Sequence, residues 1–119
     1  YSVLRPEVMN DHKGNRIAQE NRALIEQLLN FDYLIIAGQA KSHCVAWTID
    51  DLLTEIQQRN PNLAKKVYLL EDCTSPVVVP GGADFSEQAD VAFKRFQANG
   101  MHLVQSTEPM KNYLSSSKQ

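Results

Sequence analysis

The chain has 119 residues, 43% apolar and 22% charged, a balance typical of one soluble globular domain. Twelve Lys and Arg against fourteen Asp and Glu leave a net charge of -2, so no basic field is available to attract a phosphate backbone. The longest apolar run, Tyr33 to Ala37, is far shorter than the ~20 residues of a membrane span. We therefore expect no nucleic-acid partner and no membrane crossing.

The first residues show neither the basic head nor the apolar run of a secretory signal, which favours a cytoplasmic protein. The sequence begins with Tyr1 and not with Met, and one interpretation is that these residues are a tag-free, processed or truncated piece of a longer polypeptide. Pro6, Gly14 and the polar cluster Asn10 to Arg16 predict a surface connection over residues 1–16.

Helices and strands are predicted to alternate along the rest of the chain. Apolar residues at helical spacing predict helices over residues 16–29, 44–59 and 84–99. Asp84 is the expected N-cap of the last helix, with Glu87 as its capping-box partner. Short continuous apolar runs predict parallel strands over residues 33–37, 67–70 and 101–105.

This order predicts an α/β fold, with right-handed crossovers that build a parallel sheet and place helices on both of its faces. Three strands make a thin sheet, and all three are of the buried type, so at least one apolar edge would remain exposed. The sequence therefore resembles half of a domain more than a whole one.

Cys44 is the candidate nucleophile, because it falls in the first turn of a helix that follows the first strand. Ligands of open α/β sheets bind beyond the carboxyl ends of the strands, and the helix dipole stabilises a thiolate there. The alternative interpretation is that Cys44 is a small buried hydrophobe, as free cysteines often are.

The segment GQAKSHCVAWTIDDLL resembles the nucleophile motif of the isochorismatase-like cysteine hydrolases, a superfamily that includes nicotinamidases and N-carbamoyl amide hydrolases. The matching positions are Gly38, Ala40, Cys44, Val45, Thr48 and Asp50 or Asp51. The similarity continues through VYLLEDC, DFSEQADVAFKRF and GMHLVQSTEPM, and it covers about residues 17–109. It implies a three-layer α/β/α, Rossmann-like domain of which residues 1–119 are only the C-terminal portion.

The resemblance also implies a Cys, Lys and Asp triad in which Asp takes the thiol proton, Lys supports the charge and the thiolate attacks an amide carbonyl. Cys44 would be the nucleophile, and the N–H groups of Ala40 and Cys44 would hold the oxyanion. The family pattern places a cis peptide bond at Gln39-Ala40. The Asp and the Lys would lie upstream of Tyr1, so the missing N-terminal half is an expected partner. Lys13 is a weaker candidate for the Lys, and its alternative is a surface charge.

Four further residues are candidates for the pocket around Cys44: His43, Trp47, Glu71 and Asp72. His43 suits a pocket mouth or a bond to a carbonyl better than an in-line dyad with its neighbour. Trp47 and Phe85 would stack on an aromatic substrate or pack in the core. Cys73 is a pocket wall, a redox partner or an inert buried thiol.

No metal site and no cofactor are predicted within the segment, because the three His residues are scattered and unpaired. The resemblance allows a zinc ion in the full-length enzyme through upstream ligands. Gly81-Gly82 is interpreted as a turn, since the Lys-Ser/Thr of a phosphate loop is missing.

The sequence thus predicts a cysteine hydrolase that cleaves the carbon-nitrogen bond of a small amide through a Cys44 thioester, and that acts as a homo-oligomer. The alternative hypothesis is a catalytically silent α/β module of the same fold, used for ligand binding or oligomerisation.

Overall fold

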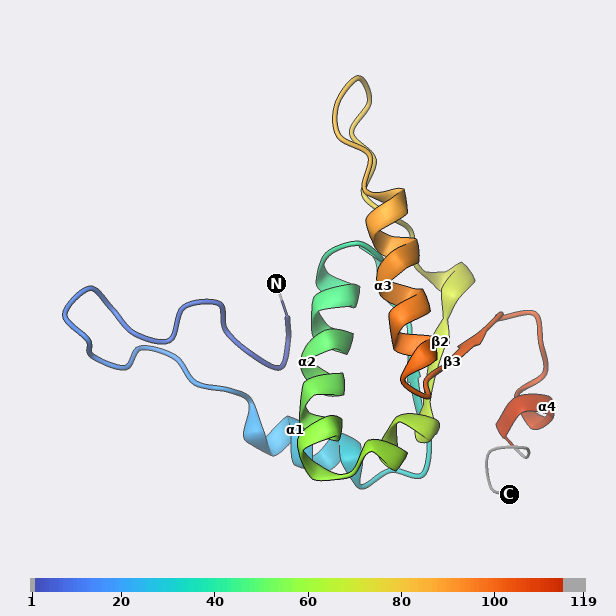
Figure 1. Cartoon of the computed structure of the whole chain (residues 1–119), viewed down its shortest axis with the longest axis horizontal. Coiled ribbons are helices and arrows are strands. Elements are labelled where there is room, and N and C mark those ends of the chain that lie inside the picture. The colour runs from blue at the N-terminus through green and yellow to red at the C-terminus, as the bar shows by residue number, and fades with distance from the viewer. Residues whose placement is uncertain (1, 115–119) are drawn as a thin grey trace.

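The computed structural model describes residues 2–114, and Figure 1 shows how its elements are arranged. The helices are α1 (Arg22–Leu29), α2 (Cys44–Arg59), α3 (Ser86–Ala98) and α4 (Met110–Leu114), with short 3-10 helices η1 (Pro61–Lys66) and η2 (Glu71–Cys73). The strands are β1 (Leu34–Ile36), β2 (Val67–Leu70) and β3 (His102–Val104).

The three strands form one parallel sheet in the order β1-β2-β3, with β2 in the middle. Leu34 is paired with Val67, and Leu69 is paired with Leu103. The alternation of helices with parallel strands confirms the α/β class predicted from the sequence.

The main core lies on one face of this sheet, where α1, α2 and α3 pack. Leu34, Val67 and Leu69 point into it from the strands, and each is at most 8% exposed. Ile49 and Phe96 are completely buried on α2 and α3, which lie side by side in front of the sheet in Figure 1. Burial of this apolar surface is what holds the sheet and the helices together.

The opposite face carries a smaller cluster built on Tyr68, Val104 and Tyr113 of the five-residue helix α4. Ile35 of β1 points to this side and is 37% exposed. Among residues 2–114, the five-residue helix α4 is the helix of this cluster, so the described fold is α/β with a small three-stranded parallel sheet and lacks a complete second layer of helices.

Two helix starts were predicted wrongly. α1 begins at Arg22, not at residue 16, because the Asn21 side chain caps the helix by accepting a hydrogen bond from Leu24 N–H. Ile17 is 62% exposed, and its N–H donates to the carbonyl of Met9. Residues before Asn21 are therefore tied to the N-terminal segment and do not join the helix.

The capping box predicted for α3 is also wrong. Phe85 occupies the N-cap position, and the Asp84 carboxylate accepts a hydrogen bond from Ser86 N–H two residues on. Asp84 is instead part of a projecting arm, residues 77–85, in which Val78 is paired with Asp84 across an antiparallel bridge. This arm rises from the start of α3 at the top of Figure 1.

The N-terminal segment is more than the surface connection that the sequence predicted. Leu4 is only 1% exposed and belongs to the main core, and its carbonyl accepts a hydrogen bond from Asn21 N–H. Most of the other residues up to 16 are exposed, as expected. None of the helices in residues 2–114 combines the length and apolarity that a bilayer crossing requires.

Candidate active site around Cys44

The loop that follows β1 runs beside the loop that follows β2. Gly38 N–H donates to the carbonyl of Cys73 (3.2 Å), Ser75 N–H to that of Gln39 (2.9 Å), and Lys41 N–H to that of Ser75 (2.9 Å). The bridge between Ala40 and Ser75 extends the parallel pairing of β1 and β2. The segment that leads to Cys44 is therefore anchored on both sides of Ala40.

The loop after β2 is tied in turn to the loop after β3. The Asp72 carboxylate accepts hydrogen bonds from the backbone N–H (2.8 Å) and the hydroxyl of Ser106. These bonds hold the pKa of Asp72 below its ordinary value of 3.8. Asp72 lies beyond the carboxyl end of β2, where its carboxylate joins the loop after β2 to the loop after β3.

Cys44 is the first residue of α2, as predicted, and its side chain is exposed. It is therefore not a buried core thiol. Cys73 is exposed as well, which rules out the interpretation of that residue as an inert buried thiol.

Two backbone N–H groups at or near the thiol make no described hydrogen bond. Among the hydrogen bonds of residues 2–114, neither Ala40 N–H nor Cys44 N–H serves as a donor. The carbonyl of Ala40, in contrast, accepts from His43 N–H and Val45 N–H, both at 3.1 Å. These two N–H groups are therefore not committed to other described partners, which leaves them available as donors to an anionic oxygen near Cys44.

The cis bond implied for Gln39-Ala40 is not present, because the described peptide bonds are all trans. Gln39 and Lys41 both pair with Ser75 as an extended strand does, and this pairing suits a trans backbone.

His43 and Trp47 belong to an aromatic cluster next to Cys44. The His43 ring lies 5.2 Å from Trp47 and 4.7 Å edge-on from Phe85, measured between ring centres. Its Nδ1 is 2.8 Å from the Ser42 hydroxyl oxygen, which accepts a hydrogen bond from Val77 N–H. Trp47 is 39% exposed and lies about one helical turn after Cys44, so its indole is on the same side of α2 and does not fill the core.

Glu71 forms an ion pair with Lys41, a residue of the Cys44 loop that was not among the predicted site residues. The Lys41 ammonium lies 3.3 Å from Glu71 Oε1 and 3.1 Å from Asp90 Oδ1, and the residue is only 6% exposed. A lysine in a polar loop gives no sequence signal of burial, so only the three-dimensional arrangement reveals it. Lys13, the predicted stand-in for the missing lysine, is exposed in a turn where its N–H donates to Asp11.

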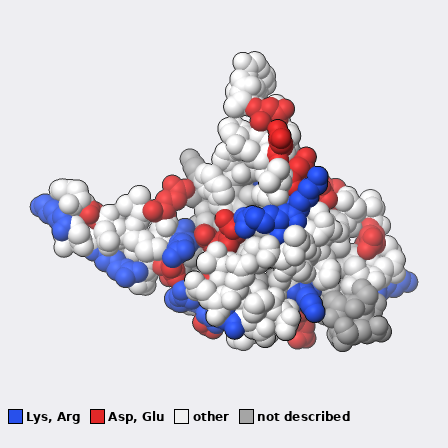
Figure 2. All heavy atoms as spheres, in the orientation of Figure 1, with Lys and Arg blue, Asp and Glu red and all other residues white. Residues whose placement is uncertain are grey.

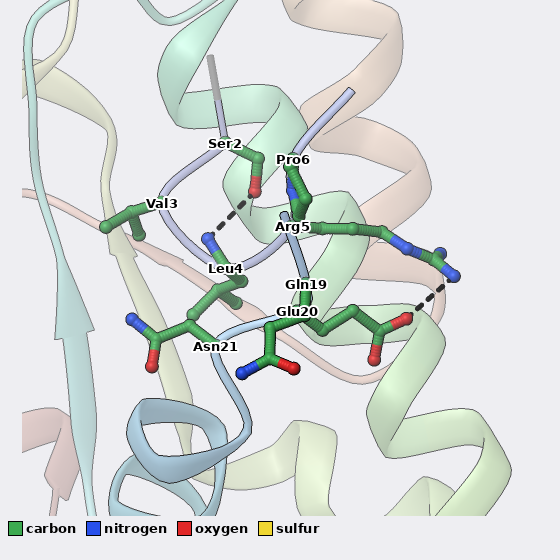
Figure 3. Close-up of a pocket in the computed structure, with 8 residues that line it drawn as sticks. All are labelled: Ser2, Val3, Leu4, Arg5, Pro6, Gln19, Glu20 and Asn21. Atoms are coloured by element: carbon green, nitrogen blue, oxygen red, sulfur yellow. Dashed lines mark hydrogen bonds and ion pairs between the residues drawn. The ribbon is translucent and has the colours of Figure 1, made fainter. Parts of the chain in front are cut away.

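The N-terminal part of the chain forms the hollow shown in Figure 3, where two stretches that precede α1 lie side by side. This hollow, of about 420 Å³, is lined by Ser2, Val3, Leu4, Arg5, Pro6, Gln19, Glu20 and Asn21. Its walls are joined by the ion pair of Arg5 with Glu20 (2.9 Å). A second hollow, of about 410 Å³, is lined by residues 2 and 5–7 together with Trp47 and Asp51, so it begins one helical turn from Cys44.

Comparison of the chain with protein-family models, with curated proteins and with solved structures finds no match. Within residues 2–114, no three His, Cys, Asp or Glu side chains come together as a metal ion would require.

Proposed function

We propose that this chain is the C-terminal portion of an isochorismatase-like cysteine hydrolase that cleaves the carbon-nitrogen bond of a small amide. The observation that carries the proposal is the exposed Cys44 thiol at the first turn of α2, beside the N–H groups of Ala40 and Cys44, which make no other described bond. The similarity of residues 38–53 to the nucleophile motif of that superfamily supports it independently.

In the proposed reaction the Cys44 thiolate attacks the carbonyl carbon of the amide. The carbonyl oxygen becomes an oxyanion that accepts hydrogen bonds from Ala40 N–H and Cys44 N–H, and each such donor is worth ~3 kcal/mol. Collapse of the tetrahedral species breaks the carbon-nitrogen bond and releases the amine with the thiol's proton. Water then hydrolyses the thioester to the acid and returns the thiol.

The proton acceptor in this scheme is an Asp supplied from upstream of Tyr1. The carboxylates at this edge of the sheet are already engaged, because Glu71 pairs with Lys41 and Asp72 accepts from Ser106. A catalytic base must reach the thiol proton, and a carboxylate held in another bond is poorly placed to do so.

The same upstream half would complete the three-layer fold. β1 is an edge strand, and Ile35 and the nearby Phe31 expose 37% and 53% of their surface. Apolar side chains beside an unpaired strand edge are the usual mark of a surface that another strand or helix covers. A zinc ion, if the full enzyme holds one, would take its ligands from that half.

The two exposed thiols allow a direct test on the complete polypeptide. Iodoacetamide is added at pH 6, and the alkylation rates of Cys44 and Cys73 are measured separately by peptide mass spectrometry. We expect Cys44 to react at least ten times faster, because its exposed thiol lies at the first turn of α2 beside N–H groups that make no other described bond. Cys73 serves as the internal control, since it is exposed in the same loop cluster. Equal, slow labelling would contradict the proposal and favour a catalytically silent module.

A further inference from the structure

Lys41 has the smallest exposed fraction of the charged side chains in residues 2–114. It lies three residues before Cys44, and the scheme proposed above does not use it. A buried ammonium is costly unless it is paired, so its position requires a specific set of partners.

Those partners come from two other elements. The ammonium contacts Glu71 of η2, which follows β2, and Asp90 of α3, and it lies 4.8 Å from the centre of the Phe93 ring. The Lys41 backbone N–H donates to the carbonyl of Ser75 at the same time. One residue therefore joins the Cys44 loop to the β2 loop and to α3.

The joined segment is short and otherwise exposed. Ala37, Gly38 and Gln39 are exposed, and Ala40 is only partly buried, so little apolar packing holds the loop. Lys41 and Ser42 are the buried residues between β1 and Cys44. Fixing this loop fixes Ala40 N–H relative to the first turn of α2, which is the geometry that an oxyanion needs in advance.

We propose that Lys41 is a positioning residue, which holds the loop before Cys44 in its reactive geometry through Glu71 and Asp90. The inference rests on the proposed role of Cys44 and adds a residue to it. Lys41 acts here through the backbone and does not itself touch the substrate.

Lys41→Met is the informative variant, because it removes the charge and keeps a chain of similar length to pack on Phe93. The fold should survive the change, since the Glu71 and Asp90 side chains are 35% and 60% exposed and can be hydrated once the ammonium is gone. Lys41→Arg keeps the charge and tests rescue. Lys94→Met, an exposed lysine of α3, is the matched control.

The readout is the iodoacetamide rate of Cys44 between pH 5 and pH 9, together with deuterium exchange of the Gly38 and Ser75 amides. In Lys41→Met we expect a fall of about tenfold in the Cys44 rate at pH 6, a shift of its pH profile to higher pH, and faster exchange of both amides. Lys41→Arg should recover most of the rate, and Lys94→Met should match the wild type. If Lys41→Met loses its circular-dichroism signal, the same measurements are made on Asp90→Asn, for which we expect a smaller fall in the Cys44 rate.

The outcomes separate the two proposals. A wild-type Cys44 that reacts no faster than Cys73 overturns the hydrolase proposal and, with it, the effect of Lys41 on reactivity. A fast wild-type Cys44 whose rate and pH profile are the same in Lys41→Met overturns the role of Lys41 alone. Slower reaction in Lys94→Met, or no rescue by Lys41→Arg, would equally contradict that role.

Discussion

Gly38, in the loop that follows β1, lies close to the first turn of α2. A Cβ added there would lie 2.6 Å from Cγ2 of Val45, whose side chain is 6% exposed and packs in the main core. This approach requires a residue without a side chain, whatever its backbone angles.

The close approach gives a prediction about Gly38→Ala. The variant should lose about 1–3 kcal/mol of unfolding free energy, because the added methyl overpacks the junction of loop and helix. The measurement is urea unfolding at pH 7. Val45→Ala alone also destabilises the fold, by opening a cavity. The double variant should lose less than the sum of the two single losses, since the clash is relieved. Strict additivity would show that Gly38 and Val45 do not interact.

At the scale of single residues the sequence placed Cys44 correctly at the first position of α2, because strand, turn and helix patterns all meet there. It did not select Lys41, whose burial depends on carboxylates 30 and 49 positions further along the chain. Composition and local spacing do not predict contacts between residues so far apart in the chain.

α1 and α2 are joined by ion pairs that meet at Glu55. The Arg22 guanidinium donates to both oxygens of the Glu55 carboxylate, at 2.8 and 2.7 Å, and Arg59 lies 3.6 Å away on the same helix. Glu55 is only 8% exposed, so water replaces these contacts poorly. The hydrogen bonds from Arg22 hold the pKa of Glu55 below its ordinary value of 4.5.

A lowered pKa in the folded state means that the pair stabilises the fold above pH 4.5 and that this contribution is lost as the pH falls through the folded-state value. We therefore expect Glu55→Gln to be less stable than the wild type at pH 7, with the difference shrinking as the pH falls toward 3. Urea unfolding at several pH values measures it. Glu108→Gln, an exposed carboxylate in the turn after β3, is the control and should follow the wild type throughout. A Glu55→Gln difference that stays constant with pH would contradict the account.

At the scale of elements, the periodicity of apolar residues predicted α2 with its observed bounds. The continuous apolar run over residues 67–70 predicted β2 with its observed bounds as well. Asn60-Pro61 ends α2 sharply, because proline cannot continue a helix. The starts of α1 and α3 were missed, since Asn21 and the arm of residues 77–85 decide them by local hydrogen bonds. The periodicity of apolar residues does not show which local hydrogen bonds form at these starts, so it does not predict where the helices begin.

The whole molecule combines a compact α/β body with two projections, the N-terminal segment and the arm of residues 77–85 (Figure 1). Acidic and basic side chains are intermixed over the face in Figure 2, and the tip of the arm carries neither. The arm exposes Val78 and Val79. Its base is bonded to Ser42, so it is anchored next to the Cys44 loop.

Leu4 packs the N-terminal segment into the main core of the body. Leu4→Ala should cost about 2 kcal/mol of unfolding free energy, at the lower end for a buried leucine because the segment can relax into the space. Val3→Ala is a matched control, since Val3 is 61% exposed and its loss should change the stability by less than about 0.5 kcal/mol. Chemical unfolding of both variants checks this. Equal, small effects would mean that the segment contributes nothing to the core.

The role of Cys44 as nucleophile is tested most directly by trapping the thioester. The complete polypeptide is mixed with a panel of small amides, quenched in acid during turnover and examined by intact-protein and peptide mass spectrometry. We predict an acyl adduct on the Cys44 peptide, present in Cys73→Ala and absent, together with turnover, in Cys44→Ala. Turnover that persists in Cys44→Ala, or an adduct that forms on another residue, would contradict the account.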